Sequence, residues 1–324
     1  MNKIIFYLRD YLKAHFNWGL FLTLGIFLAV VIYWNFTYFD IEIKGKIYNR
    51  NFERSVLDEF RNTNWYFLVN FLYYMVPYLV GAIAVGIFGF GFSFLKKPGF
   101  WIVLSIFAAI LAGDTWFKWY DVTDNPETRG YWRSVMYKLV RAGFYFVPIT
   151  IYYLFRRKQM ESFHGLTTKG FIAKPYLIMM AIMVPALIWA SFDKSFLAKY
   201  PLMPTHHAIS AAEFYGVSLT TTFSFYQLLY AITFVGLELC FRGFVIFEME
   251  RYLGEKVVIP MVCVYCTLHF GKPMMECVSS IFGGFILGVI ALKSRSVFGG
   301  VWVHIFIAVG MDVLAYLQKF VFTV

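Results

Sequence analysis

The chain has 324 residues, of which 60% are hydrophobic and 22% aromatic, and its formal net charge is +10. Soluble domains rarely have this composition, whereas recurring apolar runs of about 18 or more residues are typical of membrane-spanning helices. The positive charge suits a protein that flanks an anionic leaflet, so membrane lipids are the expected surroundings. Because no soluble basic domain is visible, nucleic acid is not expected as a partner.

The N-terminal residues 1–15 place Lys3, Arg9 and Lys13 between apolar residues. This pattern predicts a short amphipathic helix at the membrane interface, and the alternative is a basic lead-in to the first span. Apolar runs then predict five spans within residues 1–216, at about 17–37, 65–95, 100–117, 137–155 and 174–193. The segments between them predict polar loops, among them 39–64, with a helix near 52–61, and 194–216.

The last third of the chain, 217–324, is denser in helices. Its apolar runs predict four more spans, at about 218–250, 256–270, 273–293 and 297–322. The segment Gly284-xxx-Gly288 is a helix-packing motif. The fold class is therefore an all-α, polytopic transmembrane bundle of about nine spans. Basic residues in the short loops predict a multi-pass protein of the cell membrane whose N-terminus is cytoplasmic.

Two charged residues lie inside one of these apolar runs. Glu238 and Arg242 are four residues apart, so on a helix their side chains share one face and can meet. Charged groups in a membrane helix are costly and usually face the bundle interior, where they mark function. The alternative is a structural pair that braces neighbouring helices.

Further polar residues follow in the same four helices, namely His269, Glu276 and His304. A carboxylate and two histidines can activate water, either directly as a general base or through a bound metal. Arg242 can stabilise a developing oxyanion, or hold Glu238 ionised where the dielectric is low. Taken singly, each of these residues is more often structural; their concentration in consecutive helices favours a site.

Two other sets of residues fit a metal or catalytic role less well. Asp312 follows His304 by eight residues, which separates the two by roughly 12 Å along an unbroken helix. Asp312 is therefore expected to support the site residues or the fold rather than to bind the same ion as His304. Cys263 and Cys266 have the spacing of half a zinc site. A structural zinc site needs four ligands with a loop between the pairs, so these cysteines are expected to be packing residues.

The order of these motifs resembles a known family. Glu238-x-x-x-Arg242-Gly, then Tyr265-x-x-x-His269, then a glycine-rich helix and a final helix with His304, is similar to the CPBP family. These are the CAAX-processing and bacteriocin-processing intramembrane proteases, also called the Abi family. The resemblance covers about residues 220–315. It implies an all-α membrane core with a water-filled cavity, and peptide hydrolysis that depends on a metal or on glutamate.

By position, Glu238 matches the second glutamate of the family's Glu-Glu-x-x-x-Arg motif and Arg242 its arginine. His269 matches the middle histidine and His304 the last one. With Glu276 as a further acid, these residues form the expected catalytic set. Glu238, His269 and His304 are the expected ligands if a divalent metal such as Zn²⁺ is bound.

The sequence departs from the family pattern at two positions. The family's first glutamate, to which the water-activating role is usually assigned, is Leu237 here. The polar residue expected four positions after the last histidine is Ala308. If Leu237 occupies the catalytic position, activity has to use Glu238 or Glu276, or is absent.

Three functions follow as hypotheses. The first is an intramembrane endopeptidase, a hydrolase whose substrate is a membrane-associated protein or peptide. The second is a catalytically inactive membrane protein on the same scaffold, which binds a peptide or lipid or acts in immunity; the two departures favour it. The third is a transporter, against which the lack of an inverted repeat counts.

Overall fold

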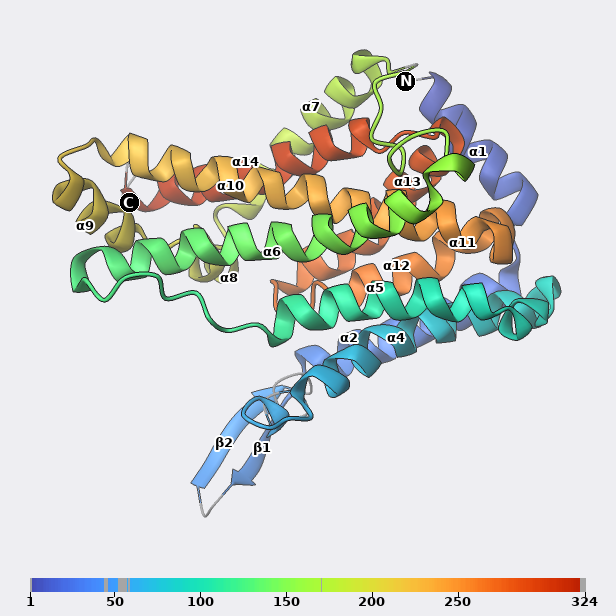
Figure 1. Ribbon diagram of the computed structural model, residues 1–324, viewed down its shortest axis with the longest axis horizontal. Coiled ribbons are helices and arrows are strands. Elements are labelled where there is room, and N and C mark those ends of the chain that lie inside the picture. The colour runs from blue at the N-terminus through green and yellow to red at the C-terminus, as the bar shows by residue number, and fades with distance from the viewer. Residues whose placement is uncertain (1, 44–45, 52–56, 58, 170, 321–324) are drawn as a thin grey trace. The chain divides into compact units, whose positions relative to one another are not determined.

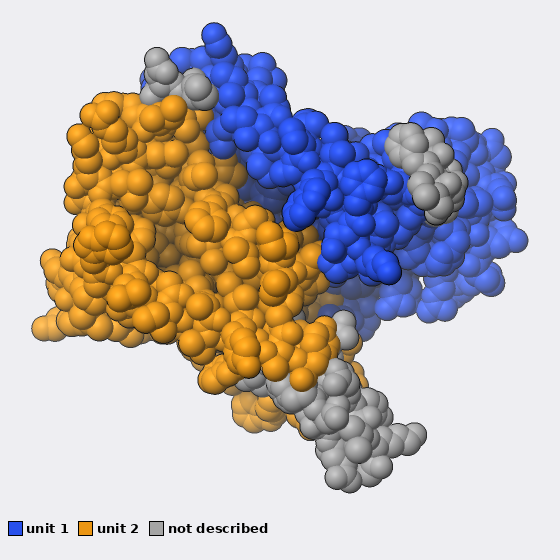
Figure 2. All heavy atoms as spheres, turned by 180° about the vertical axis from the view of Figure 1, so that it is seen from behind, with its two compact units in different colours: residues 1–3, 118–240, 295–324 blue, residues 4–117, 241–294 orange. Residues whose placement is uncertain are grey.

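The structure is a computed structural model that describes residues 2–43, 46–51, 57, 59–169 and 171–320. The chain forms two compact units (Figure 2): unit 1 comprises residues 1–3, 118–240 and 295–324, and unit 2 comprises residues 4–117 and 241–294. Both units contain residues from each side of position 217. The separate core expected for 217–324 stays a prediction.

Unit 2 is organised around helix α4, which packs against α5 and α12, while α13 packs against α12 (Figure 1). Local signals set the helix ends. Asn17 caps α2 by accepting a hydrogen bond from the Leu20 N–H at 3.0 Å, and α5 begins with Pro98 in its first turn. The helices of this unit are α1 (Asn2–His15), α2 (Trp18–Phe36), α4 (Tyr66–Val85), α5 (Pro98–Trp116), α11 (Ile246–Leu253), α12 (Val258–Thr267) and α13 (Met274–Ser294).

The predicted packing motif Gly284-xxx-Gly288 faces α12. A Cβ atom on Gly284 would lie 2.9 Å from the Tyr265 ring, and one on Gly288 would lie 2.8 Å from Met261. Both distances are too short for a side chain, so the glycines let α13 approach α12 closely. The motif therefore positions Tyr265 and the helix that leads to His269.

A β-hairpin occupies part of the segment 39–64, where the sequence analysis predicted a loop. Strand β1 (Tyr38–Ile43) pairs antiparallel with β2 (Lys46–Asn51). Apolar and polar residues alternate in β1, and a second short run follows after two residues; these are hairpin signals that the loop prediction overlooked. Most of the helix predicted near 52–61 lies outside the described residues.

Unit 1 is organised around α10, which packs against both α6 and α14. Helix α7 packs against α14, and α9 packs against α6 and α10. Helices α6, α10 and α14 run side by side in Figure 1. The helices of this unit are α6 (Pro126–Arg156), α7 (Ala173–Ala190), α8 (Lys194–Lys199), α9 (Thr205–Tyr215), α10 (Leu219–Glu238) and α14 (Phe298–Phe320).

Two of the predicted polar loops are partly helical. The loop expected at 194–216 contains α8 and α9. Asp193 caps α8 by accepting from the Ser195 and Phe196 N–H groups, and Gly216 ends α9 with a φ of 63°. The fourth helix begins at Pro126, earlier than the predicted 137, because Asn125 caps it. The capping residues Asp193 and Asn125 lie in polar stretches, where hydropathy alone does not mark the end of a helix.

The all-α, multi-pass character of the fold is confirmed. Among the described residues, seven stretches are long and apolar enough to cross a membrane. One of them, Leu219–Thr267, contains α10, α11 and α12, which the sequence divides into two spans. Helix α6 is not among the seven, and its apolar half carries Lys138 and Arg141. The predicted count of about nine spans is not confirmed.

The long helix expected over 218–250 is interrupted. Helix α10 ends at Glu238, a π-helical segment follows at Leu239–Val245, and α11 begins at Ile246. A π-helical turn inserts an extra residue into the α-helical repeat and is frequent at functional sites. The interruption begins directly after Glu238 and contains Arg242, so it changes the helix face presented on either side of the motif.

Candidate active site

Glu238 and His304 form a buried pair within unit 1. The Nδ1 atom of His304, on α14, lies 2.7 Å from Oε1 of Glu238, the last residue of α10. The Glu238 side chain is 0% exposed and that of His304 is 13% exposed. The ring of Phe234, one turn before Glu238, lies 4.4 Å from the His304 ring. The structure thus brings together two of the predicted site residues from helices far apart in the sequence.

The hydrogen bond defines the proton positions of the pair. A carboxylate oxygen accepts, so Nδ1–H of His304 donates to Glu238. In the neutral imidazole the second ring nitrogen, Nε2, then carries a lone pair. A carboxylate that holds a histidine in this tautomer also stabilises the imidazolium that forms when Nε2 takes a proton. The pair has the chemistry of a general base.

Gly300 makes room for the Glu238 carboxylate. It lies in the first turn of α14, and a Cβ atom built on it would be 2.8 Å from Oε2 of Glu238. Any larger residue there would displace the carboxylate. Gly300 could not be assigned to the site from the sequence, because a glycine at a helix start does not show what lies opposite it.

The two departures from the family pattern are both apolar and buried. Leu237 is 7% exposed. Ala308 is 1% exposed and belongs to an apolar cluster with Tyr226, Tyr230 and Met203. Neither position offers a polar atom to the chemistry. Within α10, the acid next to the position of the family's first glutamate is therefore Glu238.

Arg242 and His269 each pack against the ring of Tyr265 within unit 2. The Arg242 guanidinium lies 4.1 Å from the centre of the Tyr265 ring, a cation–π distance. The ring of His269 lies 4.7 Å from that of Tyr265. Arg242 is 0% exposed, and Gly284 backs the Tyr265 ring from α13. Tyr265 thus positions both predicted site residues.

The tautomer of His269 follows from its partner. Its Nδ1 lies 2.7 Å from the backbone oxygen of Tyr265. A carbonyl oxygen accepts, so Nδ1–H donates and Nε2 is left with a lone pair. Such an Nε2 can accept a proton or bind a cation. His269 is thus chemically suited to either of the roles predicted for it.

The turn that carries His269 is fixed by two residues that sequence analysis missed. Asn35 of α2, which is 0% exposed, donates to the Phe270 carbonyl at 3.1 Å. The Tyr73 hydroxyl of α4 donates to the Thr267 carbonyl at 3.4 Å. An asparagine within an otherwise apolar span was the available signal for Asn35, since buried polar side chains in membrane helices take a specific partner.

Glu276 forms an ion pair with Lys272. The Lys272 Nζ lies 3.4 Å from Glu276 Oε1, and the two side chains are 23% and 19% exposed. Lys272 lies between His269 and α13, and Glu276 lies in the first turn of α13. The pair holds a carboxylate near the end of the His269 turn, in unit 2.

Asp312 has the structural role that was expected. It is 0% exposed. Its Oδ1 accepts from the Leu202 backbone N–H at 2.9 Å, and its Oδ2 accepts from Gln227 at 2.8 Å. These bonds tie α14 to α10 and to the segment before α9. Asp312 is thus part of the frame that holds α10 and α14 together.

The five predicted site residues fall into two groups. Glu238 and His304 belong to unit 1, whereas Arg242, His269 and Glu276 belong to unit 2. Each group is ordered within its own unit. The meeting of all five around one water or ion stays a prediction.

The donors for a metal ion are not assembled within the described part of the chain. No three His, Cys, Asp or Glu side chains are grouped there so that they could hold an ion. The four cysteines are free and buried, and the Cys266 and Cys277 sulfurs lie 3.8 Å apart. The described residues thus contain no assembled three-donor metal site, and no reaction step is derived through a metal.

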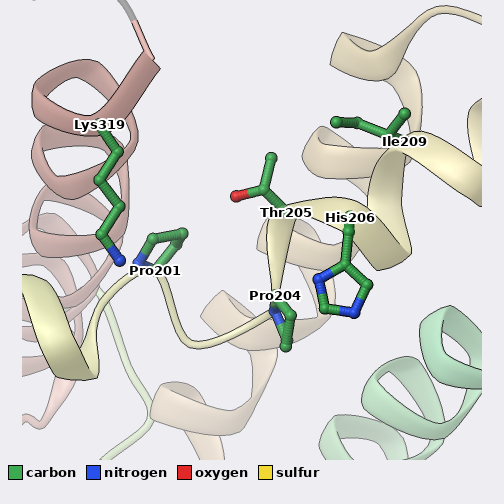
Figure 3. A pocket seen from close by; sticks show the side chains of 6 residues that line it. All are labelled: Pro201, Pro204, Thr205, His206, Ile209 and Lys319. Carbon is green, nitrogen blue, oxygen red and sulfur yellow. The ribbon is translucent and has the colours of Figure 1, made fainter. Parts of the chain in front are cut away.

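A pocket of about 320 Å³ in unit 1 lies away from these residues. It is bounded by Lys319 of α14, by the start of α9 and by the loop before it (Figure 3). Its lining residues are Pro201, Pro204, Thr205, His206, Ile209 and Lys319. The Lys319 Nζ donates to the Tyr200 carbonyl at 2.7 Å. None of the predicted site residues lines this pocket.

Fold and site together define a polytopic helical membrane protein with a buried carboxylate–imidazole pair. Residues 219–310 match the family described as Rce1-like, type II CAAX prenyl endopeptidase Rce1-like. The match covers less than a third of the chain, begins at the first residue of α10 and contains all five predicted site residues. It agrees with the resemblance to the CPBP family that the motifs indicated. No curated protein and no solved structure is significantly similar to the chain.

Proposed function

We propose that the protein is an intramembrane endopeptidase that hydrolyses a peptide bond of a membrane-associated protein or peptide. The observation that carries the proposal is the hydrogen bond of 2.7 Å between Glu238 and His304 in a buried setting. The family match supports CAAX-type intramembrane proteolysis at the level of the class. The assignment of roles to single residues rests on the geometry.

In the proposed reaction, Nε2 of His304 takes a proton from water while the water oxygen attacks the scissile carbonyl carbon. Glu238 holds His304 through Nδ1 and stabilises the imidazolium that forms. The tetrahedral intermediate then collapses, the C–N bond breaks, and the imidazolium returns its proton to the leaving amine. Proton and electron pairs balance within this cycle without a further reactant.

The second group supplies charge stabilisation in this proposal. Arg242, held over Tyr265, stabilises the oxyanion that develops on the carbonyl oxygen. His269 donates or accepts a proton through its Nε2. Glu276 is the alternative acid for water activation, should Glu238 act as a positioning residue for His304.

A divalent metal such as Zn²⁺ is the alternative means of activating water. Glu238, His269 and His304 are the side chains that would hold it, and a bound metal would supply a water of lowered pKa. The Nδ1 atoms of His304 and His269 donate to Glu238 and to the Tyr265 carbonyl, which leaves Nε2 of each ring able to bind a metal. Removal of metal by a chelator therefore distinguishes the two routes.

The test is cleavage of lipidated CAAX peptides and of unmodified transmembrane peptides by the purified chain in liposomes. We expect Glu238→Gln and His304→Gln each to lower kcat by about 10²- to 10⁴-fold. The double variant should be no slower than the slower single variant, because the two side chains act as one unit. Glu213→Gln, an exposed glutamate of α9, is the matched control.

The single variants separate the possible acids. If Glu276→Gln abolishes cleavage while Glu238→Gln leaves it at the wild-type rate, water activation belongs to Glu276. If all site variants cleave as fast as the wild type, the proposed site is wrong.

The second candidate function is a non-catalytic membrane protein that binds a peptide or lipid on the same scaffold. The apolar, buried Leu237 and Ala308 favour it. Saturable binding of the same peptides with no turnover, unchanged by Glu238→Gln, would support this function over the endopeptidase.

A further inference from the structure

The N-terminal helix α1 has one face fixed on unit 2. Tyr11 is 0% exposed, and its ring meets that of Phe285 on α13 edge to face at 5.5 Å. The His15 ring packs against Tyr11 at 4.9 Å. Helix α1, which lies beside α13 in Figure 1, is thus held on α13 by an aromatic contact that fixes its rotation about its own axis.

The two acidic side chains near this contact, Asp10 and Glu255, are paired with basic residues of the same unit. Lys293 of α13 lies 2.9 Å from Asp10 and 2.8 Å from Glu255. His15 lies 2.8 Å from the other oxygen of Glu255. Glu255 belongs to the turn between α11 and α12. The negative charges of Asp10 and Glu255 are therefore paired within the unit.

The opposite face of α1 combines apolar and basic side chains. Ile5 is 52% exposed, Leu12 37% and Phe16 46%. Arg9 and Lys13 are exposed and lie among them. The spacing of Ile5, Arg9, Leu12 and Lys13, with intervals of three and four, places these four on one helical face, and Phe16 follows directly after the last helical residue. An exposed face of this kind lies in the membrane interface, with apolar side chains among the acyl chains and cations among headgroups.

Further cations lie at the same end of unit 2. The start of α2 touches the segment after α4, since a Cβ atom on Gly19 would lie 2.3 Å from Phe88. That segment continues to Lys96 and Lys97, both exposed. Two exposed lysines thus follow a segment that touches the start of α2, whereas Asp10 and Glu255 are paired internally.

We propose that the outer face of α1 is a docking surface for anionic phospholipid headgroups. Charge complementarity selects this partner: Arg9 and Lys13 bind the headgroup phosphates, while Ile5, Leu12 and Phe16 enter the leaflet. Each basic residue close to an anionic surface strengthens such binding roughly fivefold, so two act together roughly 25-fold. The inference does not depend on the proposed proteolytic activity.

The test uses the full chain in nanodiscs, with a bimane fluorophore on Leu12→Cys; the native cysteines are buried. Quenching by spin-labelled phosphatidylglycerol is compared with quenching by spin-labelled phosphatidylcholine. We expect stronger quenching by the anionic lipid at this position. A reporter on Ile182→Cys, an exposed position of α7, should show no preference.

Charge variants decide the outcome. Arg9→Gln with Lys13→Gln should remove the preference at Leu12→Cys, and Arg9→Glu with Lys13→Glu should reverse it. Lys169→Gln with Lys194→Gln removes the same charge from exposed sites of unit 1 and should leave the preference intact. The proposal is overturned if the Leu12 and Ile182 reporters respond alike, or if the Arg9 and Lys13 variants keep the preference.

Discussion

Replacing Gly300 by alanine is a small change aimed at the Glu238–His304 pair. The new Cβ atom would stand 2.8 Å from Oε2 of Glu238 and 3.6 Å from its carboxyl carbon. Ordinary van der Waals contact begins at 3.4 Å. The carboxylate is the mobile end of a side chain, so it can retreat, but it is also the partner of His304. Gly300→Ala therefore tests the effect of moving the Glu238 carboxylate while the glutamate itself is kept.

The size of the effect follows from the displacement. Oε2 of Glu238 has to retreat by about 0.6 Å to restore ordinary contact. A misplacement of about 1 Å costs roughly 100-fold in rate, so we expect kcat to fall roughly tenfold. Alanine improves helix propensity by about 1 kcal/mol, while weakening a hydrogen bond to a charged group costs about 1.5–3 kcal/mol. The net loss of unfolding free energy is then about 0.5–2 kcal/mol.

Two measurements check this prediction, namely peptide cleavage in liposomes and unfolding by titration with dodecyl sulfate. The matched control is Gly143→Ala in α6, where a Cβ atom would meet nothing within 4 Å. That variant should gain stability and keep its rate. If Gly300→Ala cleaves at the wild-type rate and is as stable as Gly143→Ala, the carboxylate of Glu238 is not seated against Gly300 and the reasoning fails.

Three more predictions concern the metal, the helix frame and pH. If the metal-free reaction is correct, dialysis against a strong chelator leaves the cleavage rate unchanged; a loss that Zn²⁺ restores would contradict it. Asp312→Asn keeps one acceptor and turns an N–H toward a donor, so we expect it to lower the unfolding free energy by about 1–3 kcal/mol, whereas the exposed Asp124→Asn should change little. Burial lowers the pKa of His164 to about 4, from 6.5. Because its neutral form is favoured in the folded state, the stability that it contributes is present above pH 6.5 and lost as pH falls through 4, by about 3 kcal/mol. The unfolding midpoint should depend less on pH across this range in His164→Asn, a variant whose asparagine tolerates the φ of 47° at this position. If the pH dependence of the midpoint is unchanged in that variant, other groups cause the loss of stability.

Helical periodicity and apolar length predicted most of the secondary structure, because each helix in a membrane has to satisfy its own backbone. The interruption after Glu238 could not be predicted in this way. A π-helical segment shifts the repeat by one residue, and such a shift is visible only where polar and apolar faces contrast. The segment Leu239–Val245 is apolar on every side of Arg242, so its sequence looks the same with either repeat.

The contacts that order the site depend on tertiary structure in the same way. The sequence shows that Glu238 and His304 are buried polar residues, and this was enough to place both in one predicted site. It does not show that Gly300 faces the carboxylate, or that Asn35 holds the turn of His269, since the partners are far apart in the chain. Spacing identifies candidates within one helix; packing between helices selects the partners.

The leucine at position 237 decides which group can activate water in the proposed mechanism. Two adjacent glutamates on a helix point about 100° apart, so one can face a partner helix while the other faces the cavity. Here the first position is apolar and buried, and Glu238 is engaged with Nδ1 of His304. A carboxylate that already accepts a hydrogen bond from an imidazole is a poor direct base for water. In the proposed mechanism the atom that takes the proton from water is therefore Nε2 of His304. With leucine at position 237, the proposed mechanism thus activates water through His304, and the Glu238→Gln and His304→Gln variants test this proposal directly.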